Sequence, residues 1–119
     1  DDTFPNNPAQ AHPDQIVAVR NRKFFNDASK DWMGDVYKVV YAVHDFLPLF
    51  SYFTFPDHGQ TVLYPKARPD VTAVYDDLEQ ISRMSFMDFL ETRERVMNRA
   101  GYEQIFSELL AWREEIGAA

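Results

Sequence analysis

The clearest pattern in the chain is a run of apolar residues at three- and four-residue steps between Trp32 and Leu47. This spacing is the period of one face of a helix. Ser29 or Asp31 can cap the start of that helix. Pro48 ends it, because proline has no backbone N–H and restricts the residue before it. The sequence therefore predicts an amphipathic helix that stops just before Pro48.

The C-terminal half carries three more helical patterns. The first begins at Pro69 and ends near Ile81. The second begins at Ser85, which has the spacing of a capping box with Asp88, and Gly101 is the type of residue that follows a helix end. The third covers most of the chain beyond Gly101. Short connectors predict that these three helices pack as antiparallel neighbours.

We expect one side of each of these helices to contribute to a single hydrophobic core. A domain of 119 residues is large enough for one such core. Its predicted members are Val36, Val40, Val43, Leu47, Val74, Leu78, Phe89, Leu90, Phe106, Leu109 and Trp112.

The N-terminal part is less regular. Residues 1–13 hold three of the seven prolines and show no period, which predicts an extended arm. Pro13 and Asp14 are both favoured at a helix start, and a helix is predicted from residue 14 to about residue 26. The fold prediction is thus mainly α: a single small helical domain of four to five helices at residues 14–119, with an extended arm before it.

The middle of the chain is predicted to be an aromatic-rich loop. Residues 49–55 fit either a further helical turn or a short extended segment, and the period does not decide between them. Residues 56–68 follow no period. Residues 60–64 could form a brief strand, but no partner strand is visible in the sequence, so a loop is expected there.

Charge narrows the range of partners. The formal net charge is −7, and it is concentrated late in the chain. Residues 1–68 carry eight acids and seven bases, giving −1, whereas residues 69–119 carry eleven acids and five bases, giving −6. An acidic surface repels phosphate backbones, so nucleic acid is not expected as a partner.

A membrane span is not expected either. The apolar stretch at residues 36–55 is long enough to span a bilayer, but Lys38, His44, Asp45 and Pro48 lie within it. A single Asp at the bilayer centre costs about 2.5–3.5 kcal/mol on insertion scales. Contact with a membrane complex is still compatible with this composition.

Few residues indicate a chemistry. The chain has no Cys, and its only neighbouring His–carboxylate pairs are His44–Asp45 and Asp57–His58. Side chains of adjacent helical residues point in different directions, so we predict no metal site and no cofactor. His58, on an expected exposed turn, is the best candidate for acid–base catalysis, but no nucleophile pattern accompanies it.

Aromatic residues are abundant, at 15% of the chain. Tyrosines combine an apolar ring with a hydroxyl that needs a polar neighbour, which suits a protein interface. Four aromatic residues lie beyond the break at Pro48, and we predict that at least two of them are exposed and bind a partner. The predicted partner-binding residues are Phe4, Phe50, Tyr52, Phe53 and Phe55.

These observations favour a non-catalytic accessory or structural subunit of a larger protein assembly. Its partners would be other protein subunits, bound through the aromatic segment, the N-terminal arm and the acidic helical face. The alternative is a small acidic regulator, such as an inhibitor or immunity-type protein, that blocks a basic partner. The third hypothesis is a small enzyme that uses His58. The chain begins at Asp1, and removal of a mitochondrial targeting peptide is one origin compatible with that start.

Overall fold

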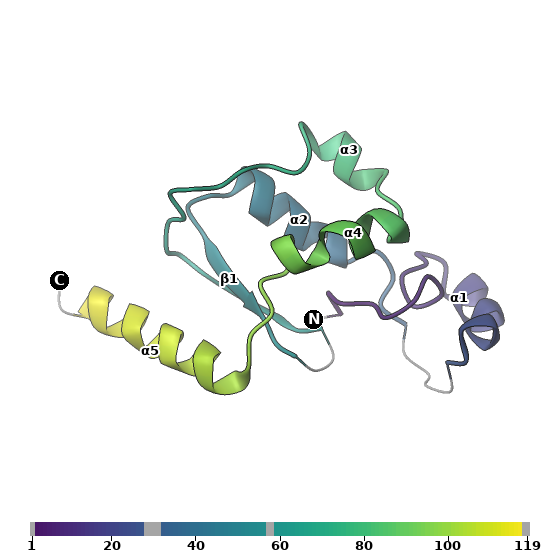
Figure 1. Cartoon of the computed structure of the whole chain (residues 1–119), viewed down its shortest axis with the longest axis horizontal. Coiled ribbons are helices and arrows are strands. Elements are labelled where there is room, and N and C mark those ends of the chain that lie inside the picture. Colours follow the sequence, from purple (N-terminus) through teal and green to yellow (C-terminus); the bar gives the residue numbers. More distant parts are fainter. Residues whose placement is uncertain (1, 28–31, 57–58, 118–119) are drawn as a thin grey trace.

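The structure is a computed structural model that describes residues 2–27, 32–56 and 59–117. About half of these residues are helical, and a two-stranded sheet lies among the helices (Figure 1). The elements in chain order are α1 (Gln15–Asn21), the 3₁₀ helix η1 (Arg22–Phe25), α2 (Tyr37–Phe46), β1 (Ser51–Thr54), β2 (Thr61–Tyr64), α3 (Leu78–Ser82), α4 (Phe86–Val96) and α5 (Tyr102–Gly117). The prediction of a small, largely helical domain is correct at this coarse level.

Residues 51–64 contain a β-hairpin, so the loop expected at residues 60–64 is wrong, whereas the extended alternative for residues 49–55 is confirmed. β1 and β2 pair antiparallel, with Ser51 opposite Tyr64 and Thr54 opposite Thr61. Each segment is only four residues long, so neither shows a period convincing enough to predict a strand alone. Each strand supplies the backbone partner that the other needs, and that pairing is visible only in three dimensions.

The hairpin separates two groups of buried residues. Successive side chains of a strand point to opposite faces, so Tyr52 and Phe53 cannot share one core. Tyr52 packs with residues of α2 and α4, whereas Phe53 and Tyr64 pack with Ile105 of α5. The hairpin is therefore a middle layer, with α2 and α4 on one face and α5 on the other (Figure 1).

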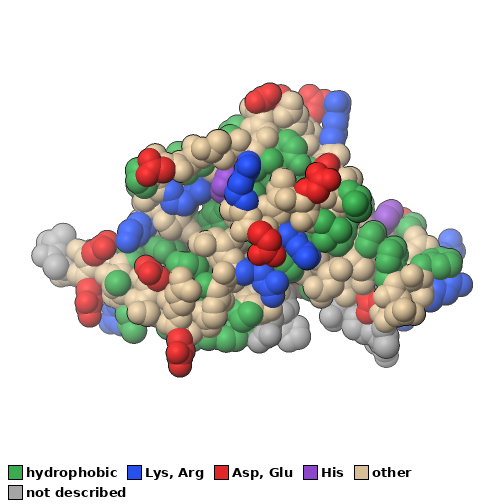
Figure 2. Space-filling model, viewed as in Figure 1, with side chains coloured by type: hydrophobic (Ala, Val, Ile, Leu, Met, Phe, Trp, Pro, Cys, Tyr) green, Lys and Arg blue, Asp and Glu red, His purple; other side chains and the backbone are tan. Residues whose placement is uncertain are grey.

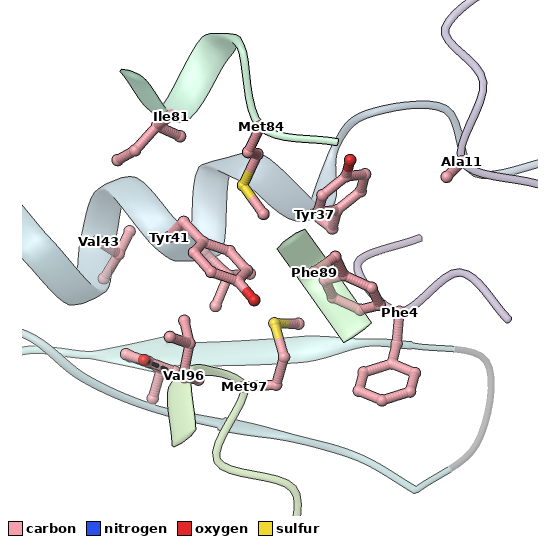
Figure 3. Packing of buried hydrophobic residues seen from close by; sticks show 12 residues of the cluster. Phe4, Ala11, Tyr37, Tyr41, Val43, Ile81, Met84, Phe89, Val96 and Met97 are labelled. Carbon is pink, nitrogen blue, oxygen red and sulfur yellow. Dashed lines mark hydrogen bonds between the residues drawn. The ribbon is translucent and has the colours of Figure 1, made fainter. Parts of the chain in front are cut away.

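The larger core is built around aromatic rings from α2 and α4. Tyr41 and Phe89 are fully buried and point into the middle of the cluster (Figure 3). The Phe89 ring centroid lies 4.8 Å from that of Tyr37 and 5.4 Å from that of Phe4. Such tilted and edge-to-face contacts are favoured by the ring quadrupoles. This core thus draws on the helices and on the N-terminal arm together.

The N-terminal arm is held against the hairpin turn. The Thr3 backbone N–H donates a hydrogen bond to the Gly59 carbonyl at 2.6 Å. Gly59 has a φ of +60°, and a Cβ at this position would lie 2.4 Å from the Phe4 nitrogen. Only glycine fits such an approach. The guanidinium of Arg99 lies 4.2 Å from the centroid of the Phe4 ring, so this residue is anchored on the domain itself.

Two predicted helix starts are confirmed. The Asp14 carboxylate caps α1 by accepting a hydrogen bond from Ile16 N–H at 2.9 Å. Ser85 and Asp88 form the predicted capping box at the start of α4, with hydrogen bonds of 3.1 and 2.8 Å. Side-chain oxygens at these positions satisfy N–H groups that have no partner within the helix.

Three other helix boundaries differ from prediction. α2 begins at Tyr37 rather than near Trp32, and α3 begins after Asp77 rather than at Pro69. The backbone before α3 is held in a non-helical path by the Asp45 carboxylate, which accepts hydrogen bonds from the N–H groups of Val74 and Tyr75. After α4 the left-handed residue is Asn98, with a φ of 50°, and not Gly101. Asn tolerates this region better than most residues, so it can replace glycine there.

Several predicted core residues are exposed. Val40, Val43 and Phe89 are buried as expected, whereas the exposed ones are Val36, Leu47, Leu78, Leu90 and Phe106. The prediction assumed that the four helices pack into one bundle. Because the hairpin lies between α5 and the other helices, each helix is covered on a narrower arc than the pattern suggested.

The capping box gives a test of the α4 boundary. We expect Ser85→Ala to lower the free energy of unfolding by about 0.5–2 kcal/mol, because the Asp88 N–H loses its partner. Urea denaturation measures this change. The control is Ser107→Ala, an exposed position inside α5, which should be neutral or slightly stabilising because alanine is the better helix former. Equal effects of the two substitutions would contradict a cap at Ser85.

Buried tyrosines should make the fold sensitive to alkali. Burial raises the pKa of Tyr37 and of Tyr41 to about 12. The folded chain then holds these protons more tightly than the unfolded chain, whose tyrosines titrate at about 10. The free energy of unfolding should therefore be steady below about pH 10 and fall as pH rises through the folded pKa, by roughly 2 kcal/mol for each tyrosine.

Urea denaturation at a series of pH values measures this fall. Tyr41→Phe should make the decrease shallower, because phenylalanine has no proton to lose. A decrease that is identical in wild type and Tyr41→Phe would show that other groups cause it.

Candidate partner-binding surface

Most of the predicted partner-binding residues lie inside the chain's own cores. Phe4, Tyr52 and Phe53 are only 5%, 4% and 9% exposed, and Phe50 and Phe55 are half-buried. The expectation that at least two of the four aromatic residues beyond Pro48 are exposed is therefore wrong. The reason is strand pairing, which covers both faces of β1 with helices.

Phe55 differs from the other predicted binding residues, because its ring contacts exposed aromatic residues of α5. It follows β1, and its ring centroid lies 5.1 Å from that of Tyr102 and 6.3 Å from that of Phe106. Phe106 and Leu110 are 54% and 56% exposed. We refer to Phe55, Tyr102, Phe106 and Leu110 as the aromatic patch.

The helical period of α5 explains why this patch remains uncovered. Tyr102, Phe106 and Leu110 are four residues apart, so they form one row along the helix. Ile105 and Leu109 lie on the neighbouring row and pack against the hairpin. A two-stranded sheet is too narrow to cover both rows, so the first row faces outward.

The patch has acidic surroundings. α5 carries Glu103, Glu108, Glu114 and Glu115, with Arg113 as its single basic residue. Acidic side chains lie among hydrophobic ones along this helix (Figure 2). A contiguous apolar surface with a charged rim is typical of a site that binds another protein.

A second apolar surface lies at the opposite end of the molecule. Ile16, Val19, Phe24 and Phe25 of α1 and η1 are all exposed, and Phe24 and Phe25 line a shallow hollow of about 400 Å³. The structure measures 53 × 32 × 20 Å, with α1 near one end and α5 at the other (Figure 1). Two groups of exposed apolar residues thus lie toward the two ends of the elongated chain, and others, such as Val39 of α2 and Leu63 of β2, belong to the elements between them.

The histidines are not brought together in the described part of the chain. His44 Nδ1 lies 2.6 Å from Asp45 Oδ1, and the His12 ring accepts a hydrogen bond from the Asp14 N–H. His58 lies outside the described residues. Across residues 2–27, 32–56 and 59–117, no group of three His, Cys, Asp or Glu side chains could hold a metal ion.

The hydroxyls of Tyr41 and Tyr52 make hydrogen bonds within the core. Tyr52 donates its hydroxyl hydrogen to the Val96 carbonyl, and burial raises its pKa above the ordinary value. The Tyr41 hydroxyl lies 2.6 Å from that of Thr92. These polar contacts satisfy buried hydroxyl groups and help to specify how α2, α4 and the hairpin pack.

Among the described residues, no helix combines the length and the hydropathy needed to cross a membrane.

Comparison with models of known families, with curated proteins and with solved structures finds no match for this chain.

The sequence contained a signal for the aromatic patch that the prediction did not use. α5 has apolar residues on two adjacent rows, which together are wider than the stripe that a single contact can bury. Phe106 was assigned to the core with Leu109, although they belong to different rows. An apolar arc this wide indicates either a deeply buried helix or a helix with a second contact surface.

The two rows of α5 should differ sharply in their effect on stability. Ile105 is fully buried, so Ile105→Ala should cost about 2–5 kcal/mol. Phe106→Ala should cost less than about 1 kcal/mol, because more than half of that side chain is already exposed. Thermal unfolding of both variants tests this difference, and similar losses would mean that α5 packs on both rows.

Proposed function

We propose that this protein is a non-catalytic accessory or structural subunit whose aromatic patch is covered by another protein. The observation that carries the proposal is the exposed row of Tyr102, Phe106 and Leu110, continuous with the half-buried Phe55. Burying such a row removes apolar surface from water at a gain of about 25 cal/mol per Å². Aromatic side chains at the centre of an interface commonly dominate its energy.

The charge of α5 favours a particular type of partner. Glu103 and Glu114 lie on the same helix as the patch, and the region from residue 69 onward carries a formal charge of −6. A partner with an apolar groove and a basic rim would match both features. Phe4, Tyr52 and Phe53 would support this contact from the inside, by holding the hairpin against which α5 packs.

The second apolar surface supports a role as a subunit rather than as the ligand of one partner. Phe24 and Phe25 lie far from α5 along the long axis of the chain. Two contact regions at opposite ends would allow the chain to connect neighbouring proteins in an assembly. The N-terminal arm would contribute indirectly, because its first residues are engaged by the hairpin turn and its later residues lie beside η1.

The acidic regulator remains the second candidate, and the acids of α5 are the observation that favours it. The two candidates differ in how binding depends on salt. An inhibitor that acts mainly through charge loses affinity steeply as ionic strength rises, whereas burial of the aromatic patch does not. The third hypothesis, an enzyme that uses His58, stays a prediction.

Phe106→Ser should remove the partner without unfolding the chain. Phe106 supplies exposed apolar area at the centre of the patch, so its loss should weaken the complex by about 2 kcal/mol or more. Affinity purification of the tagged chain from its source cells, followed by size-exclusion chromatography, measures complex formation. A photo-crosslinking residue at position 106 identifies the protein that covers the patch.

Gln104 supplies the matched control, because it is exposed on the other side of α5. Gln104→Ser should retain the partner, and a photo-crosslinking residue at position 104 should not label it. Recovery of the same complex with Phe106→Ser would contradict the proposal. A complex that dissociates at moderate salt while Phe106→Ser has no effect would favour the acidic regulator.

A further inference from the structure

A basic hollow lies in this otherwise acidic protein, on a different part of the surface from the aromatic patch. It has a volume of about 350 Å³ and opens between the C-terminal ends of α2 and α4 and the start of the hairpin. The side chains that line it include His44, Lys66, Arg68, Arg95 and Asn98. Figure 2 shows Lys and Arg side chains and a His around a hollow on the face in view.

Arg68 is held in this hollow by backbone groups. Its guanidinium donates hydrogen bonds to the carbonyls of Val43 at 2.8 Å, Leu47 at 3.1 Å and Phe50. The first two are carbonyls at the end of α2, and each also accepts a backbone hydrogen bond, Val43 from Leu47 N–H and Leu47 from Phe50 N–H. No carboxylate pairs with Arg68 among the described residues. Its side chain is therefore fixed in position, and its charge faces backbone carbonyls and the ring of Tyr52, whose centroid lies 5.2 Å from the guanidinium carbon.

Arg95 is available to a ligand. It lies in the last turn of α4, is exposed, and makes no hydrogen bond or ion pair within the described part of the chain. Lys66 is weakly engaged, because its Nζ lies 3.6 Å from Glu115 Oε1 and both side chains are substantially exposed. Exposed ion pairs of this kind contribute little, so a ligand can replace Glu115 at low cost.

Neutral groups complete the hollow and keep its shape. Asn98 Nδ2 donates to the Tyr52 carbonyl at 2.7 Å, and Ser51 Oγ donates to the Lys66 carbonyl at 2.7 Å. These bonds connect the walls of the hollow to one another. The His44 ring is engaged by the Asp45 carboxylate, so we do not count it as a cation of the site.

We propose that the basic hollow binds the phosphate group of a small molecule. Lys66, Arg68 and Arg95 together carry more positive charge than a single carboxylate would balance, whereas a phosphate dianion matches them better. The acid-rich remainder of the chain repels long polyanions such as nucleic acids. The volume of the hollow limits the ligand to a small phosphate ester or free phosphate. This inference does not depend on the proposed function, because the two sites share no residue.

Isothermal titration calorimetry at constant ionic strength tests the proposal with three probes: inorganic phosphate, ribose 5-phosphate and adenosine 5′-monophosphate. We expect saturable binding of at least one probe, weakened at least tenfold in Arg95→Gln. Arg20→Gln, which removes the same charge from α1, should bind as wild type does. Tighter binding of an ester than of phosphate would identify an organic phosphate as the ligand, and equal binding would identify the free ion.

Circular dichroism checks that Arg95→Gln is folded, and Lys66→Gln provides a second variant that should also weaken binding. The proposal is overturned if no probe binds at concentrations up to about 10 mM. It is also overturned if adenosine binds as well as its monophosphate, because the phosphate would then contribute nothing. If Arg95→Gln and Arg20→Gln weaken binding equally, the effect comes from the overall charge of the protein. That result would also overturn the proposal.

Discussion

The pairing of β1 with β2 is the constraint on which the rest of the structure depends. Alternation along β1 directs Tyr52 to one face and Phe53 to the other, so the hairpin requires cover on both sides. α2 and α4 cover the first face, and α5 covers the second. The free edge of β1 is used as well: Thr54 accepts a hydrogen bond from Ala100 N–H and donates one to the Asn98 carbonyl. These two bonds fix the short connection between α4 and α5.

Single polar side chains organise the segments that have no regular structure. The buried Asp45 carboxylate accepts hydrogen bonds from the backbone N–H groups of Val74 and Tyr75, both at 3.0 Å. Hydrogen bonds to an ionised acceptor are stronger than those between neutral groups. The Arg68 guanidinium plays the opposite role, because it donates hydrogen bonds to carbonyls at the end of α2. Together these side chains connect the segment between the hairpin and α3 to α2.

The interactions that organise the fold also shape the two candidate sites on the surface. Arg68 brings its charge to the hollow because it is bound to the end of α2, and Asn98 lines that hollow because it ends α4 with a left-handed residue. The aromatic patch arises in a similar way, since α5 has a wider apolar arc than the hairpin can cover. The hollow therefore forms where α2 and α4 end beside the small sheet. The aromatic patch forms where the apolar surface of α5 extends beyond that sheet.

Local patterns in the sequence determined the helix signals that depend on neighbouring residues. Ser85 and Asp88 are three residues apart, so their capping box forms from local geometry alone, and the same holds for Asp14 at the start of α1. Tertiary structure decided whatever depends on a distant partner. The strands needed each other, the segment before α3 needed Asp45, and the exposure of Phe106 depended on the width of the sheet beneath α5. Hydrogen bonds and burial between residues far apart in the chain leave no period in the sequence, so only the folded chain shows which apolar residues are covered.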